Sequence, residues 1–159
     1  MTELYGSCNH TMKNTKYRTW VTEIISILLI ILFVYAATSK LLDYHKFQVQ
    51  LSQSPILTAF SRQIAMLIPA LEILISILLV TKKFRLPGLY ASFTLLLLFI
   101  GYIIAITKFS SYIPCSCGGI LENFGWNAHL LLNIFFGVLA LTGIIIYSQQ
   151  TKTKKFLLQ

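Results

Sequence analysis

Residues 20–37 of the chain read WVTEIISILLIILFVYAA, an apolar run with a single acidic residue near its start. Three more apolar runs follow, at residues 64–80, 87–106 and 128–147. A helix needs roughly 20 residues, within a range of about 17–25, to cross the hydrocarbon of a bilayer. All four runs meet that length, the second only just. The sequence therefore predicts an all-α fold, an integral membrane four-helix bundle that occupies residues 20–147.

The composition also indicates a membrane protein. Of the 159 residues, 56% are hydrophobic and 11% are charged, and the mean hydropathy is +0.73. Soluble domains carry about 25% charged residues, so the lipid bilayer is the expected surrounding of this chain. The net charge of +8 comes from basic residues that flank the apolar runs. That placement favours an orientation signal over nucleic-acid binding, so we expect no nucleic-acid partner.

The loop charges predict the orientation in the membrane. Nine basic residues lie in the N-terminal tail, residues 1–19, in the connection after the second run, and in the basic C-terminal tail, residues 148–159. Four lie in the other two connections. Four spans put the first set on one side, which the positive-inside rule makes cytoplasmic. We therefore expect both termini in the cytoplasm and the third connection outside.

An alternative interpretation takes the first run for a signal peptide. Basic residues precede it, and Val34-Tyr35-Ala36 resembles a small-residue cleavage site. The long polar leader argues against cleavage. A cleaved chain would keep three spans, and its third connection would still lie outside.

Two patterns bear on packing. The first connection, residues 38–63, carries apolar side chains among polar ones, which suggests a short helix at the membrane interface. Those side chains are Leu41, Leu42, Phe47, Val49 and Leu51. Small residues in the fourth run, which let helices approach closely, are Gly137, Ala140 and Gly143.

Cys115 and Cys117 stand in the sequence PCSCGG, residues 114–119, just before the fourth run. They could be structural cysteines that share a turn. They could instead be a redox pair, because a disulfide across one residue closes a small ring that departs from relaxed geometry, and strained, exposed disulfides are the labile or catalytic ones. A third interpretation is capture of Cu(I) or zinc with His129. We favour the redox pair and predict no metal site.

Glu72 lies near the middle of the second run. An ionisable residue at that depth costs about 2.5–3.5 kcal/mol on insertion scales, so it should face other helices. It could be a neutral acid that hydrogen-bonds across the bundle, or a proton relay or quinone contact. Lys40 and Asp43 end the first run on the outer side, and a local ion pair between them is the simplest expectation.

His129 and Asn133 open the fourth run, four positions apart, and so share one helical face. Their face begins close in sequence to Cys117. A histidine there could lower the pKa of a cysteine or pass protons. The simpler interpretation is interfacial hydrogen bonding.

The chain resembles the MauE/DoxX group of small membrane proteins, in particular the branch named for methylamine utilisation. The resemblance runs from the first span to the fourth. Its marks, in order, are Ser39-Lys40-Leu41-Leu42-Asp43 followed by Phe47, then Pro69-Ala70-Leu71-Glu72, then Cys115-Ser116-Cys117-Gly118. The family pattern often has Phe between the second cysteine and the glycine, whereas here Gly118 follows Cys117 directly.

The resemblance implies a bacterial inner (cytoplasmic) membrane and a role in disulfide chemistry outside the cytoplasm. MauE-type proteins are associated with making the disulfide-rich small subunit of methylamine dehydrogenase. DoxX-type relatives are linked to quinone-coupled oxidation of sulfur compounds. Both roles suit an external thiol pair.

We therefore expect a thiol-disulfide oxidoreductase in which Cys115 and Cys117 exchange with an extracytoplasmic thiol protein, while Glu72 and His129 support electron and proton transfer. A membrane quinone or a second thiol protein could take the electrons. The alternative is a non-enzymatic subunit or assembly factor in which the two cysteines only crosslink the loop. A transporter or a metal-handling protein is a third class, with little support from the sequence.

Overall fold

The computed structural model describes residues 2–52, 60–109 and 125–156. Within these ranges the chain is helical, and four of its helices are long and apolar enough to cross a membrane. The protein is thus an all-α, multi-pass membrane bundle, as the sequence predicts. In chain order the elements are α1 (Thr2–Leu42), α2 (Tyr44–Ser52), α3 (Ser61–Val80), the short 3-10 helix η2 (Lys82–Phe84), α4 (Arg85–Phe109) and α5 (Gly125–Phe156).

Polar side chains within the spans bond mostly to their own helix. The Ser26, Ser76 and Ser92 hydroxyls each donate to the carbonyl oxygen four residues earlier, at 2.8–2.9 Å. Such bonds satisfy hydroxyl groups where lipid offers no partner. The apolar runs can therefore carry serine and threonine and remain membrane helices.

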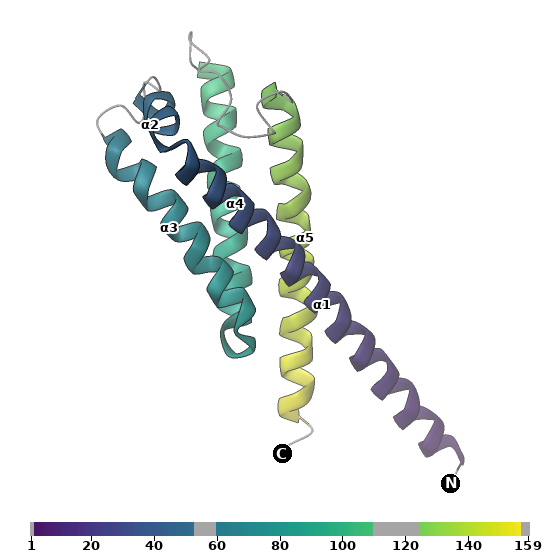
Figure 1. Ribbon diagram of the computed structural model, residues 1–159. Coiled ribbons are helices and arrows are strands. Elements are labelled where there is room, and N and C mark those ends of the chain that lie inside the picture. Colours follow the sequence, from purple (N-terminus) through teal and green to yellow (C-terminus); the bar gives the residue numbers. More distant parts are fainter. Residues whose placement is uncertain (1, 53–59, 110–124, 157–159) are drawn as a thin grey trace.

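The long helices alternate in direction, so both ends of the chain lie at the end of the bundle that carries η2 (Figure 1). We call this the η2 end, and the opposite one, where α2 lies, the α2 end. The most extensive contacts are those of α1 with α3 and of α4 with α5. Contacts of α1 with α5 and of α3 with α4 join these two pairs into a ring.

The two pairs converge towards the η2 end. A Cβ atom on Gly88 would lie 3.2 Å from the Leu79 backbone nitrogen and 3.3 Å from the Leu78 carbonyl carbon, so only glycine lets α4 approach α3 this closely. Tyr147 of α5 donates a hydrogen bond from its hydroxyl to the Lys82 carbonyl oxygen, at 3.2 Å. The buried core consists of Ile25, Leu29, Phe33, Ile75, Leu79, Leu89, Leu95, Leu96, Ala140 and Ile144.

The small residues of α5 differ in their use. Gly143 allows α5 to pack closely against α1 and α4, because a Cβ at this position would lie 3.2 Å from side-chain atoms of Ile25 and Leu89. Ala140 is fully buried in the core. Nothing lies within 4 Å of a Cβ built on Gly137. The prediction of close packing is thus confirmed for Gly143 and Ala140 and is wrong for Gly137.

Helix α2 matches the short helix suggested for the first connection. Phe47 and Leu51 bury their side chains beside Ala65 of α3, whereas Leu41, Leu42 and Val49 are exposed. The one-turn spacing of Phe47 and Leu51 puts both on one face. The first turns of α3 are therefore covered by α2, beyond the point where α1 ends.

Candidate functional site

A mostly apolar pocket of about 290 Å³ lies at the α2 end, where α1 and α3 separate from α4 and α5. All five α-helices contribute to its wall. The described residues of α4 and α5 that flank the Cys115–Cys117 segment end and begin at this same end (Figure 1). Its polar side chains are Tyr35, Ser39, Lys40, Glu72, Tyr102, His129 and Asn133.

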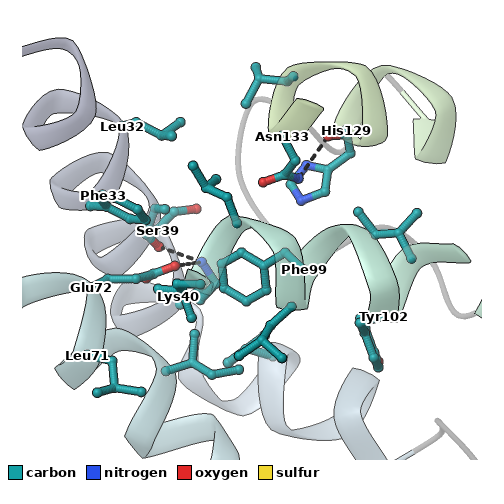
Figure 2. Close-up of a pocket in the computed structure, with 18 of the residues that line it drawn as sticks. Leu32, Phe33, Ser39, Lys40, Leu71, Glu72, Phe99, Tyr102, His129 and Asn133 are labelled. Carbon is teal, nitrogen blue, oxygen red and sulfur yellow. Dashed lines mark hydrogen bonds and ion pairs between the residues drawn. The ribbon is translucent and has the colours of Figure 1, made fainter. Parts of the chain in front are cut away.

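An ion pair across α1 and α3 is the main polar feature of the pocket. Lys40 Nζ donates to Glu72 Oε1 at 2.8 Å and to the Ala36 carbonyl oxygen at 3.3 Å. The Glu72 side chain is 0% exposed and that of Lys40 17%. Two opposite charges held this close form a neutral unit, which is how an apolar interior accommodates them. Figure 2 shows the pair on one wall of the pocket.

Two aromatic rings flank the Lys40 ammonium. Its nitrogen lies 5.9 Å from the ring centroid of Phe47 and 5.6 Å from that of Phe99. A cation within about 6 Å of a ring is attracted by the negative face of the π-system, and more strongly where water is excluded. Side chains of α2 and α4 thus help to fix a charge that α1 carries.

The second carboxylate oxygen of Glu72 is left without a hydrogen bond. Oε2 is buried, and no donor among the described residues lies within bonding distance. A buried acceptor in that state is costly, and native structures leave few of them. The pocket thus holds an ion pair with one unused acceptor in apolar surroundings.

His129 and Asn133 line the α5 wall, as their spacing of four positions predicts. The Asn133 side-chain nitrogen donates to the His129 carbonyl oxygen at 2.9 Å. The His129 imidazole lies across the pocket from the Lys40–Glu72 pair, with Phe99 on the wall between them (Figure 2). The structure therefore brings Glu72 and His129, two of the predicted site residues, into one pocket.

Cys115 and Cys117, the other two predicted site residues, lie outside the described residues. The described ends of the two flanking helices show where the chain leaves for this segment and where it returns. The described part of α4 ends at Phe109 and that of α5 begins at Gly125, and His129 is four residues further along.

The partner of Glu72 does not follow from the sequence. A local ion pair of Lys40 with Asp43 is the simplest expectation, and it is wrong, since Lys40 bonds Glu72. The error comes from the end of the first span: α1 continues to Leu42, so Lys40 is still inside the helix. Glu72 is eleven residues after the start of α3, about 16 Å along its axis. The apolar run that contains Glu72 carries no basic residue that could pair with it. This is the sequence feature that points to a cation on another helix.

The comparisons with known proteins identify one family. The family model described as methylamine utilisation protein MauE matches residues 18–146. This range begins one residue into the first span, ends within the fourth, and includes every residue that lines the pocket. No curated protein and no solved structure matches the chain.

Proposed function

Because the chain belongs to the MauE family and is thus a membrane protein associated with methylamine utilisation, we propose that it handles thiol–disulfide redox chemistry on the outer face of the bacterial inner membrane. Cys115 and Cys117 form the reactive pair. The observation that carries the proposal is the pocket: a buried ion pair and a histidine line an apolar site at the end of the bundle from which the cysteine segment leaves α4 and enters α5.

The exchange step is balanced as follows. A thiolate of an extracytoplasmic partner attacks the Cys115–Cys117 disulfide and forms a mixed disulfide. The partner's second thiolate then attacks the mixed disulfide and releases the chain's cysteine. The partner leaves with a disulfide, and Cys115 and Cys117 are left as two thiols. Re-oxidation of these thiols releases two electrons and two protons to an acceptor. A membrane quinone is the acceptor that we propose, since an apolar pocket within the spans suits a lipid-soluble ring.

The orientation rests on loop charge. The η2 end carries Lys82, Lys83 and Arg85 besides the two tails, and the α2 end has fewer basic residues. By the positive-inside rule this supports a cytoplasmic η2 end and an external α2 end. Disulfides persist outside the cytoplasm, which is where the cysteine segment then lies.

The decisive experiment traps the mixed disulfide. Cys115→Ser and Cys117→Ser are expressed singly in cells that make the native partner. In each single variant the remaining thiolate can attack the disulfide of an oxidised partner chain. Because the variant has no second cysteine to release the partner, the mixed disulfide should accumulate until reducing agent is added, and mass spectrometry should identify the attached chain. The double variant is the control. If neither single variant forms an adduct, and both still support full oxidation of the partner's thiols in cells, the cysteines are structural. The protein is then a non-enzymatic subunit or assembly factor.

A further inference from the structure

The Lys40–Glu72 pair places a donor and an acceptor side by side on one wall of a mostly apolar pocket. An ammonium group has three hydrogens, and two of those on Lys40 are used by Glu72 Oε1 and the Ala36 carbonyl oxygen. Glu72 Oε2 has no donor among the described residues. The site is therefore complementary to a group that can donate a hydrogen bond to a carboxylate and accept one from an ammonium. A phenolic hydroxyl does both.

The pocket wall reaches the lipid-facing surface. Leu98 lines the pocket, yet 65% of its surface is exposed, and it lies near the middle of α4. Tyr35 on α1 lines it as well and is 40% exposed. A ligand that enters past Leu98 comes from the hydrocarbon of the bilayer, so it must be soluble there. This excludes ions and small polar metabolites as occupants by that route.

From these two observations we infer that the pocket binds an amphiphile with a phenolic ring, and specifically the reduced, hydroxyl-bearing form of a membrane quinone. The hydroxyl donates to Glu72 Oε2 while the ring and tail lie against the apolar wall towards Leu98. The oxidised form offers only carbonyl acceptors and can bond Lys40 alone. The identification as a quinone rests on the proposed function, whereas the preference for a hydroxyl rests on the ion pair.

Binding is tested separately from thiol chemistry. The full chain with Cys115→Ser and Cys117→Ser is placed in nanodiscs of phosphatidylcholine and phosphatidylglycerol. Anaerobic affinities are then measured by native mass spectrometry for decylubiquinol and for its dimethyl ether, which has the same ring and tail but no donor. A hydrogen bond to a charged acceptor is among the stronger ones, so decylubiquinol should bind at least about ten-fold more tightly. Equal affinities would overturn the inference.

Two pairs of variants assign the preference to the site. Lys40→Met/Glu72→Leu replaces the ion pair by apolar side chains of similar volume, a change that is often neutral for buried ion pairs, and it should bring the affinity ratio near one. Glu23→Gln, at the η2 end, should keep the preference. Ala36→Trp fills the pocket and should weaken both ligands at least about ten-fold, whereas Ala70→Trp on the exposed face of α3 should not.

The outcomes separate the two proposals. A ten-fold preference that survives in the Lys40→Met/Glu72→Leu protein would mean that the hydroxyl is recognised away from the ion pair. Ligands that bind equally and are both displaced by Ala36→Trp would mean an acyl-chain pocket without hydroxyl recognition. Either result would leave the mixed-disulfide experiment untouched. Conversely, failure to trap a partner would leave the measured ligand preference standing.

Discussion

Lys40 and Glu72 are 32 positions apart in the chain, yet Lys40 Nζ lies 2.8 Å from Glu72 Oε1 inside the bundle. The contact joins the end of α1 to the middle of α3. It also places the two charged side chains among the lining residues of a mostly apolar pocket. Because each charge is tolerated only through the other, the pair links the stability of the bundle to the chemistry of the site.

Breaking the pair on one side should destabilise the fold. Glu72→Leu leaves the Lys40 ammonium buried without its counter-charge, and the expected loss is about 3–5 kcal/mol of unfolding free energy. Lys40→Met/Glu72→Leu removes both charges and should lie within about 1–2 kcal/mol of the parent or above it. Unfolding in mixed micelles with increasing SDS measures both. A single variant as stable as the double one would mean that the ammonium reaches water at low cost.

The Glu23–Arg85 pair is the matched comparison. Its atoms are 3.5 Å apart, and the Glu23 side chain is 41% exposed. The Arg85 side chain is 10% exposed, so water reaches the pair mainly through Glu23. An ion pair in contact with solvent contributes about 0–1 kcal/mol, so Glu23→Gln should cost less stability than Glu72→Leu in the same titration.

These residues show what a sequence can predict of such a protein. The four spans follow from run length and apolarity, since the bilayer imposes both. That Glu72 faces inward follows from the cost of exposing it to lipid. Its partner does not follow, because the relative height of α1 and α3 depends on where α1 ends and on how α2 packs against the first turns of α3. Neither is encoded in hydropathy.

The glycines make the same point for packing. Gly88 and Gly137 are both glycines in apolar helices, and only the approach of another helix distinguishes them. The pocket has a similar origin. It exists because the helix pairs meet at the η2 end and separate at the α2 end, a property of the assembled bundle that no local pattern reports.

Adding a methyl group should therefore have opposite consequences at two glycines of α4. A Cβ at Gly88 meets backbone atoms of α3, which cannot move aside as a side-chain tip can, so Gly88→Ala should destabilise by about 1–3 kcal/mol. Gly101 is exposed with nothing within 4 Å. Gly101→Ala should be neutral or stabilise by up to about 1 kcal/mol through helix propensity. Thermal melts in nanodiscs compare the two, and equal stabilities would refute the close contact at Gly88.

His129 should matter to the rate of re-oxidation if it carries protons for the thiol pair. General acid–base groups contribute about 10²–10⁴-fold, so His129→Gln should slow re-oxidation of reduced Cys115 and Cys117 by decylubiquinone about 100-fold. Added imidazole should restore part of the rate. The control is His45→Gln, because His45 is exposed on α2 and does not line the pocket. Unchanged rates in His129→Gln would assign this residue to hydrogen bonding alone.

The orientation of the bundle can be measured with single cysteines at its two ends. Asp43 follows α1 at the α2 end and Lys83 lies in η2, and both are exposed. In a background with Cys8, Cys115 and Cys117 changed to Ser, a membrane-impermeant maleimide should label Asp43→Cys in intact cells. Lys83→Cys should react only after the membrane is permeabilised, because its basic surroundings favour the cytoplasmic side. The reverse pattern would put the cysteine segment in the reducing cytoplasm, where a resting disulfide would not persist. The exchange partner would then have to be a cytoplasmic protein.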